Sequence, residues 1–163
     1  MLEQAAKTIP VFYSANMSLG INLLTDLVKK TARLVEQNFD IEIIEKHHNQ
    51  KLDAPSGTAL EIADCNQLGI ETISRNTCMT GIHAVKRESR NEIGIHAVRG
   101  GTIVGEHTVI FAGNDEIIEI SHTAMSKDIF GTGALRAAEF IHGKKPGIYN
   151  MDDLISEDKK RRL

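Results

Sequence analysis

The sequence predicts an α+β fold, in which a mixed or antiparallel sheet is covered by helices. Between residues 92 and 123, three segments of alternating apolar and polar residues follow one another, separated by glycine-rich turns. Stretches with the 3.6-residue spacing of amphipathic helices stand on either side, at residues 18–36 and 130–142. Because the chain has no internal repeat, these elements are expected to build one sheet with its covering helices.

The first half of the chain predicts a helix, a strand and a second helix. Residues 18–36 carry the apolar stripe of a helix, and Ser18 is placed to cap its N-terminus. Residues 39–45 alternate isoleucine with acidic residues, which is typical of a strand. After several breakers of regular structure, Ser56 or Thr58 can cap a second, short helix.

The second half predicts strands and a closing helix. Residues 65–90 are polar and irregular, and an excursion over the surface is expected there. Three alternating segments then predict an antiparallel meander, with a tight connection at Gly100-Gly101. The strands expected are 92–98, 102–111 and 116–123. The last helix, residues 130–142, is stopped by Gly143.

The bulk composition excludes several classes of protein. The 163 residues are 41% hydrophobic and 25% charged, with a formal net charge of -3, as in globular proteins. Aromatic residues make up 4% and tryptophan is absent, which argues against a nucleic-acid-stacking surface. Residues 1–10 lack the apolar stretch of a signal peptide or membrane span. Cys65 and Cys78 form no CxxC pattern, so a reducing, cytoplasmic location is expected.

The densest polar cluster runs through residues 47–51, His-His-Asn-Gln-Lys, and continues in residues 53–59, Asp-Ala-Pro-Ser-Gly-Thr-Ala. A glycine between hydroxyl residues at a helix start leaves backbone N–H groups free, at the positive end of the helix dipole. Such a turn receives carboxylates or phosphates. The sequence therefore predicts a small anion bound there, with Lys51 as its charge partner and a histidine as acid or orienting donor.

Structural interpretations compete with this one. Paired histidines in a loop are more often solvated or structural, and Ser-Gly-Thr before a helix is often only a cap. Metal binding by His47 and His48 is disfavoured, because adjacent side chains point apart and no carboxylate or cysteine stands at a familiar ligand spacing. The glycines after Arg99 lack the spacing of a phosphate loop. The histidines interpreted as structural or surface residues are His83, His96, His107 and His122.

Residues 47–59, HHNQKLDAPSGTA, resemble the signature of the dihydrodipicolinate reductases of bacterial lysine biosynthesis. That signature has a glutamate before a histidine pair and ends in DAPSGTA. Three further segments resemble the same family: IPVFYSANMSLGIN at 9–22, EIGIHAVRGGTIVGEHTVIFAG at 92–113 and EISHTAMSKDIF at 119–130. The resemblance spans nearly the whole chain except residues 65–90.

The resemblance implies the reduction of 4-hydroxy-tetrahydrodipicolinate to tetrahydrodipicolinate with NADH or NADPH, on the diaminopimelate route to lysine. By position, His47 matches the family's proton donor or acceptor, and Lys51 matches its second proton donor. His48, Gly57 and Thr58 match substrate-binding positions, and Ser56 and Lys51 are expected to bind the same dicarboxylate. The positions that match contacts to the nicotinamide side of the cofactor are Ser14, Ala15, Asn16, Met17 and Lys127.

The resemblance also implies three segments: a hinge and remnant of a Rossmann domain at 1–17, a substrate-binding, catalytic and oligomerisation domain at 18–126, and a returning hinge with a C-terminal helix at 127–163. The sequence lacks a GxGxxG fingerprint, so a fragment that is inactive alone is expected, with its preference for NADH or NADPH left open. A homotetramer through residues 92–123 is also expected. The alternatives are a non-enzymatic dicarboxylate-binding or assembly module, and a structural domain without ligand.

Overall fold

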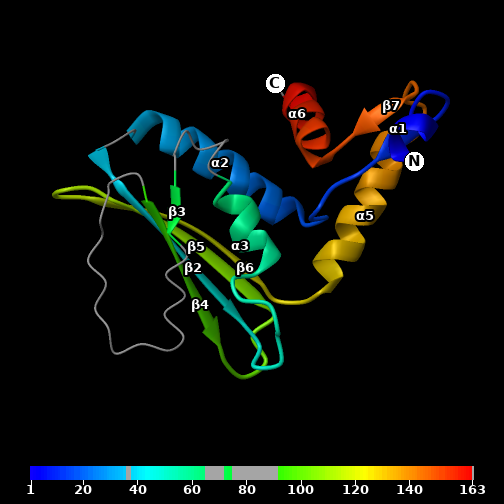
Figure 1. Ribbon diagram of the computed structural model, residues 1–163. Coiled ribbons are helices and arrows are strands. Elements are labelled where there is room, and N and C mark those ends of the chain that lie inside the picture. The colour runs from blue at the N-terminus through cyan, green and yellow to red at the C-terminus, as the bar shows by residue number, and fades with distance from the viewer. Residues whose placement is uncertain (36–37, 65–71, 75–91, 163) are drawn as a thin grey trace. The chain divides into compact units, whose positions relative to one another are not determined.

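The computed structural model describes residues 1–35, 38–64, 72–74 and 92–162. The chain divides into two compact units: unit 1 comprises Met1–Leu23 and Ser126–Leu163, and unit 2 comprises Leu24–Met125. The elements, drawn in Figure 1, are α1 (Leu2–Ala5), β1 (Pro10–Phe12), α2 (Leu19–Val35), β2 (Asp40–His47), α3 (Gly57–Ile62), β3 (Thr72–Ser74), β4 (Glu92–Arg99), β5 (Gly105–Ala112), β6 (Ile117–Ala124), α5 (Asp128–Ile141), β7 (Gly147–Tyr149) and α6 (Met151–Arg162).

Unit 2 contains a mixed sheet whose strand order, within the described residues, is β3-β4-β2-β5-β6. β4 runs parallel to β2, whereas β5 is antiparallel to both β2 and β6. The α+β prediction is confirmed, but the expected meander is wrong for its first pair, because β2 lies between β4 and β5. The Gly100-Gly101 turn passes the end of β2, where the Gly100 amide donates to the His47 carbonyl at 2.9 Å.

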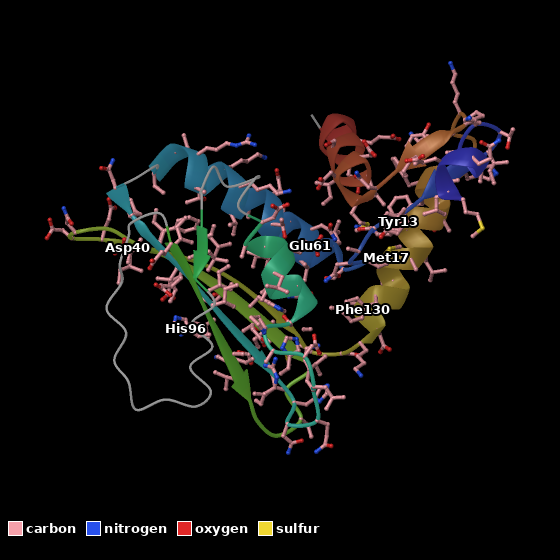
Figure 2. All side chains as sticks on the ribbon, in the orientation of Figure 1. Tyr13, Met17, Asp40, Glu61, His96 and Phe130 are labelled. Atoms are coloured by element: carbon pink, nitrogen blue, oxygen red, sulfur yellow. The ribbon has the colours of Figure 1, made fainter. Side chains whose placement is uncertain are left out.

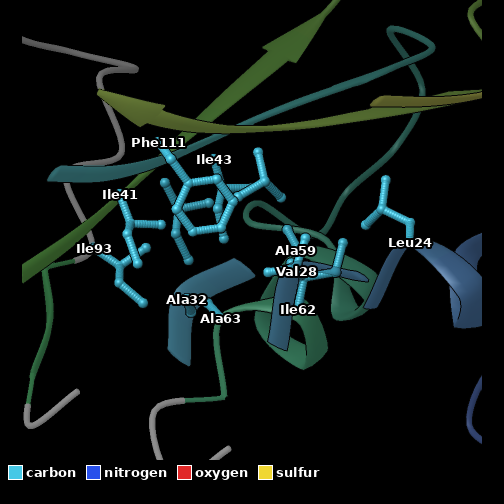
Figure 3. Close-up of a cluster of buried hydrophobic side chains, with 12 residues drawn as sticks. Leu24, Val28, Ala32, Ile41, Ile43, Ala59, Ile62, Ala63, Ile93 and Phe111 are labelled. Carbon is cyan, nitrogen blue, oxygen red and sulfur yellow. The ribbon is translucent and has the colours of Figure 1, made fainter. Parts of the chain in front are cut away.

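One face of this sheet forms the core of unit 2. Alternate β2 residues point into it, and α2 and α3 cover the same face (Figures 1 and 3). Burying each large aliphatic side chain there stabilises the fold by about 1.5–3 kcal/mol. The buried residues of the cluster are Leu24, Val28, Ala32, Ile41, Ile43, Ala59, Ile62, Ala63, Ile93, Ile95, Val109 and Phe111. The alternation continues beyond the apolar part of β2, so Glu45 and His47 are buried on this face too.

The predicted caps are confirmed. Ser18 Oγ accepts the Ile21 amide at 3.3 Å at the start of α2, and Ser56 Oγ accepts the Ala59 amide at 3.2 Å at the start of α3. The strand expected at residues 39–45 extends further and ends at His47. His47 is therefore the last residue of a strand, held by pairing with its neighbours, and not the first residue of a loop.

Unit 1 contains a parallel pair of short strands, β1 and β7, and the helices α5 and α6. Its core contains Ala137, Met151 and Leu154, with Phe12 and Phe140 packed against them. The predicted last helix is confirmed as α5, and Gly133 inside it is required because a Cβ there would overlap the Met17 carbonyl. β7 and α6 were not predicted.

Two further expectations concern residues 65–90 and a membrane-spanning segment. The surface excursion expected at residues 65–90 lies outside the described residues, apart from the short strand β3. Among the helices that the structure describes, none combines the length and the apolar character that crossing a membrane requires.

Candidate active site

The site is built around a fully buried carboxylate, that of Glu45 on β2. Its Oε2 accepts from His47 Nδ1 at 2.6 Å and from Arg99 Nη1 at 2.7 Å. Its Oε1 accepts from Arg99 Nη2 at 2.7 Å and from the Ser56 amide at 2.9 Å. Four donors thus occupy the hydrogen-bonding positions of one carboxylate.

This hydrogen bonding keeps Glu45 ionised. Burial alone would raise the pKa of Glu45, but the hydrogen bonds from Arg99, His47 and the Ser56 amide outweigh burial and lower that pKa below its ordinary value. The same pair raises the pKa of Arg99, chiefly through its hydrogen bonds to Glu45. A planar guanidinium facing a carboxylate in this bidentate way is the strongest form of such a pair.

The ionised Glu45 determines which ring nitrogen of His47 donates the hydrogen bond between them. An ionised carboxylate only accepts hydrogen bonds, so Nδ1 of His47 carries the proton that it donates to Glu45. The other ring nitrogen is Nε2. A Cβ on Gly105 would lie 3.2 Å from that nitrogen, so glycine at the start of β5 keeps Nε2 uncrowded.

A second histidine, His107 on β5, closes the network. Its Nε2 lies 3.2 Å from Ser56 Oγ, and its ring meets the His47 ring edge to face, with centroids 5.3 Å apart. Burial, followed by repulsion from the neighbouring His47 ring when that ring is protonated, lowers the pKa of His107 to about 4, so the His107 ring is neutral near pH 7. Ser56 is 2% exposed and its oxygen caps α3, so this Ser–His contact is structural and not nucleophilic.

Lys51 and the turn at Gly57 act on a common carboxylate. Lys51 Nζ forms an ion pair with Asp53 Oδ1 at 2.8 Å. The hydrogen bond from Lys51 lowers the pKa of Asp53, and the backbone amides of Asp53 and Gly57 lower it further. A Cβ on Gly57 would meet no atom within 4 Å, so the space beside the turn is open.

The structure therefore brings together the predicted residues of unit 2. His47 and the Ser56 amide both donate to Glu45, and Lys51 pairs with Asp53, three residues before Ser56. His48, which follows His47, and Thr58, at the start of α3, are half-buried, and Gly57 is exposed. The residues predicted to contact the cofactor belong to unit 1: Ser14, Ala15, Asn16, Met17 and Lys127.

The loop before α2 is braced by its own side chains. Ser14 Oγ donates to the Asn16 carbonyl and Asn16 Oδ1 accepts the Ser18 amide, both at 2.9 Å. Ala15 and Lys127 are exposed. In the described part of the chain, no group of three or more histidine, cysteine or acidic residues is arranged to hold a metal ion.

Three residues of the network were missed as functional candidates. Glu45 was treated only as part of a strand pattern, Arg99 as part of a turn, and His107 as a structural or surface residue. The interpretation of His107 as structural stands, but its contacts place it within the site. A sequence signal existed for Glu45, because strand alternation puts it on the same face as Ile41 and Ile43.

Comparison with known proteins agrees with this architecture. The chain is similar to a solved structure described as "Dipicolinate bound Dihydrodipicolinate reductase from Paenisporosarcina sp. TG-14", with a TM-score of 0.61 and 26% identity, covering 87% of this chain and 53% of that one. The fold is thus that of an α+β reductase domain. A family model described as "Dihydrodipicolinate reductase, C-terminus" matches residues 20–155. The chain belongs to this dihydrodipicolinate reductase family.

Curated relatives support the assignment. The 4-hydroxy-tetrahydrodipicolinate reductase of Caldanaerobacter subterraneus subsp. tengcongensis is 59% identical over 157 residues, which are 96% of this chain and 61% of the relative. The reductase of the same name from Clostridium novyi is 52% identical over 155 residues, 94% of this chain and 60% of the relative. The chain therefore spans about three fifths of the length of these relatives.

Proposed function

We propose that this chain supplies the substrate site and the proton-donating groups for reducing 4-hydroxy-tetrahydrodipicolinate to tetrahydrodipicolinate with NADH or NADPH. The observation that carries the proposal is the Lys51 ammonium, which lies 2.8 Å from the Asp53 carboxylate, three residues before Ser56 caps α3. A substrate carboxylate of the same chemistry is proposed to take the place of Asp53 at this ammonium.

The reaction leaves electron density on the substrate that must be protonated. His47 and Lys51 are the candidate donors, and a positioned acid contributes on the order of a hundred- to ten-thousand-fold to such a step. His48, Ser56, Gly57 and Thr58 are proposed to bind and orient the dicarboxylate. The amide nitrogens of the turn and the cationic side chains neutralise its charge.

The cofactor supplies the hydride when it is bound. The residues proposed to hold its nicotinamide side are the braced loop Ser14–Met17 and the exposed Lys127. Residues 1–17 and 127–163 are then proposed to be hinge and cofactor-side segments, and residues 18–126 the substrate-binding domain. The division of the chain into two units supports this organisation.

Replacing Lys51 with alanine is expected to weaken binding of pyridine-2,6-dicarboxylate to this chain by roughly 10- to 100-fold in calorimetry. A hydrogen bond to a charged group is worth about 1.5–3 kcal/mol, which gives this range. Thr58→Ala is expected to weaken binding less. Asp53→Asn is expected to bind at least as tightly as the unmodified chain, because it releases Lys51 from a competing carboxylate.

Lys46→Ala provides the matched control. Lys46 is on β2 five residues before Lys51, but it faces the other side of the sheet and pairs with Glu106 at 2.9 Å. Its removal is expected to leave the affinity unchanged. Equal affinities of the Lys51 and Lys46 variants would contradict the proposed site, and so would the absence of any binding by the unmodified chain, which the interpretation as a structural domain predicts.

The second face of the sheet is proposed to mediate homotetramer formation through residues 92–123. Among the described strands β6 is at the edge of the sheet, and Ile117 on it is 66% exposed. Sedimentation at micromolar concentration is expected to give a tetramer. Ile117→Glu, on β6, is expected to reduce the mass, whereas Leu135→Glu, on exposed α5 surface, is expected to leave it unchanged. A monomeric mass for the unmodified chain would refute the assembly.

An assembly module without activity predicts the same binding and the same oligomer. The exposed Ile117 on β6 agrees with both candidate functions. Catalytic activity distinguishes the two candidate functions. Only the reductase hypothesis predicts that the chain, joined to a complete dinucleotide-binding domain, reduces the substrate.

A further inference from the structure

The hydrogen bonds of Glu45 connect three features that lie far apart in the sequence. Glu45 and His47 are on β2, Arg99 is at the end of β4, and Ser56 opens α3. His47 and Arg99 both donate to Oε2 of Glu45, at 2.6 Å and 2.7 Å. Because the side chain of Glu45 is 0% exposed and that of Arg99 is 10% exposed, water competes little for these bonds.

We infer that Glu45, anchored by Arg99, is a positioning residue that keeps a proton on Nδ1 of His47, so that Nε2 is the nitrogen that takes up a proton from solvent and delivers it to the substrate. This inference rests on the proposed function and deepens it. A carboxylate that accepts from one ring nitrogen selects the tautomer and orients the ring. The side chain of His47 is 11% exposed, so the surrounding protein and not solvent decides which nitrogen is protonated.

The same ion pair also fixes the turn that is proposed to bind the dicarboxylate. Glu45 Oε1 accepts the Ser56 amide at 2.9 Å, and Arg99 Nη2 donates to the Asp53 carbonyl at 2.6 Å. The ion pair therefore holds both ends of the segment from Asp53 to Ser56. One buried carboxylate sets the direction of the histidine and the place of the turn together.

The test is the tautomer of His47 in this chain, read from long-range ¹H–¹⁵N correlations of its ring, with the signals assigned by their loss in His47→Gln. The unmodified chain is expected to show neutral His47 protonated at Nδ1. Glu45→Gln is expected to lose this single tautomer, because a neutral amide can either donate to the ring or accept from it. Binding of pyridine-2,6-dicarboxylate is expected to weaken in the same variant.

Two further variants separate positioning from folding. Arg99→Met keeps the Glu45 carboxylate, so a folded Arg99→Met chain is expected to keep the Nδ1 tautomer. The double variant Glu45→Gln/Arg99→Met removes both charges together, which avoids leaving Arg99 unpaired, and it is expected to lose the tautomer as Glu45→Gln does.

The matched control is Glu42→Gln. Glu42 is also on β2 and pairs with a histidine, His96, at 2.8 Å, but on the opposite face, where both side chains are more exposed (Figure 2 labels His96). Glu42→Gln is expected to leave the His47 ring signals unchanged. An Nε2-protonated ring in the unmodified chain, or an unchanged ring in the folded double variant, would overturn the inference. Neither result depends on ligand, so failure of dicarboxylate binding alone would count against the proposed function instead.

Discussion

Replacing Arg99 with methionine is expected to lower the free energy of unfolding by about 3–5 kcal/mol, because it leaves the buried Glu45 carboxylate without its cation. Glu45 is fully buried, and both of its oxygens accept from the Arg99 guanidinium. The Asp53 carbonyl loses a donor in the same variant. Urea unfolding followed by far-ultraviolet circular dichroism measures the loss. Tyrosine fluorescence is less useful here, because Tyr13 and Tyr149 are both in unit 1.

Two variants test the physical cause of this loss. Glu45→Gln/Arg99→Met removes both charges and is expected to recover much of the stability, because no unpaired ion remains in the interior. Lys46→Met breaks an ion pair of similar length whose side chains are 42% and 31% exposed. That change is expected to cost under about 1 kcal/mol. If Arg99→Met and Lys46→Met cost the same, burial does not govern the Glu45–Arg99 pair.

The helices of unit 2 could be predicted because their signals are local. The stripe of α2 and its Ser18 cap lie within one short stretch of sequence, and the structure has them there. The strand order could not be predicted in the same way. Periodicity identifies β4 and β5 as strands, but the pairing of β4 with β2 joins residues about fifty positions apart, and no turn signal records it.

The missed elements of unit 1 have weak local signals. β7 is three residues long, too short for an alternation to be recognised. α6 begins with Met151 and then carries Asp152 and Asp153, and its sequence is dominated by charged residues. The apolar side of α6 is buried because Met151 and Leu154 pack against α5 and β1. These contacts are with residues distant in the sequence, so the local pattern does not predict them.

The residues of the site likewise divide into those that a local motif identifies and those that only long-range strand pairing brings together. His47, Lys51 and Ser56 stand within ten residues of one another, so a short motif could identify them. Arg99 joins Glu45 across 54 residues, and only the parallel pairing of β2 with β4 brings them together. The local sign of this network is the position of Glu45 in β2, where the alternation of the strand places it on the core-facing side. An ionisable residue at a core-facing position requires a partner.

Lowering the pH from 6.5 to 4 is expected to reduce the free energy of unfolding by about 3 kcal/mol through His107 alone. Burial lowers the pKa of His107 from 6.5 to about 4, and each pKa unit corresponds to about 1.4 kcal/mol. Between these two pH values the unfolded chain binds a proton that the folded chain does not, so stability falls as the pH falls. Below about pH 4 this contribution is lost completely.

The charges around His107 act in both directions. His47, His122 and Lys51 lower the pKa of His107, and Glu45 raises it. Among the described residues, Nδ1 of His107 is buried without a hydrogen-bond partner, so an imidazolium would bury a second N–H donor with no acceptor. Glu45 adds acid sensitivity of its own, because its pKa is lowered, but that loss belongs to pH values below its ordinary value of 4.5.

Urea unfolding at a series of pH values from 7 to 4 measures this dependence, and His107→Gln is the variant that tests its origin. Glutamine retains a polar group near Ser56 but does not titrate, so the slope between pH 6.5 and 4.5 is expected to flatten. His142→Gln removes an exposed histidine from unit 1 and is expected to keep that slope. A slope that survives in His107→Gln would assign the acid sensitivity to another group. A flat profile in the unmodified chain would mean that His107 is protonated without loss of folding, and that its buried ring finds an acceptor in acid.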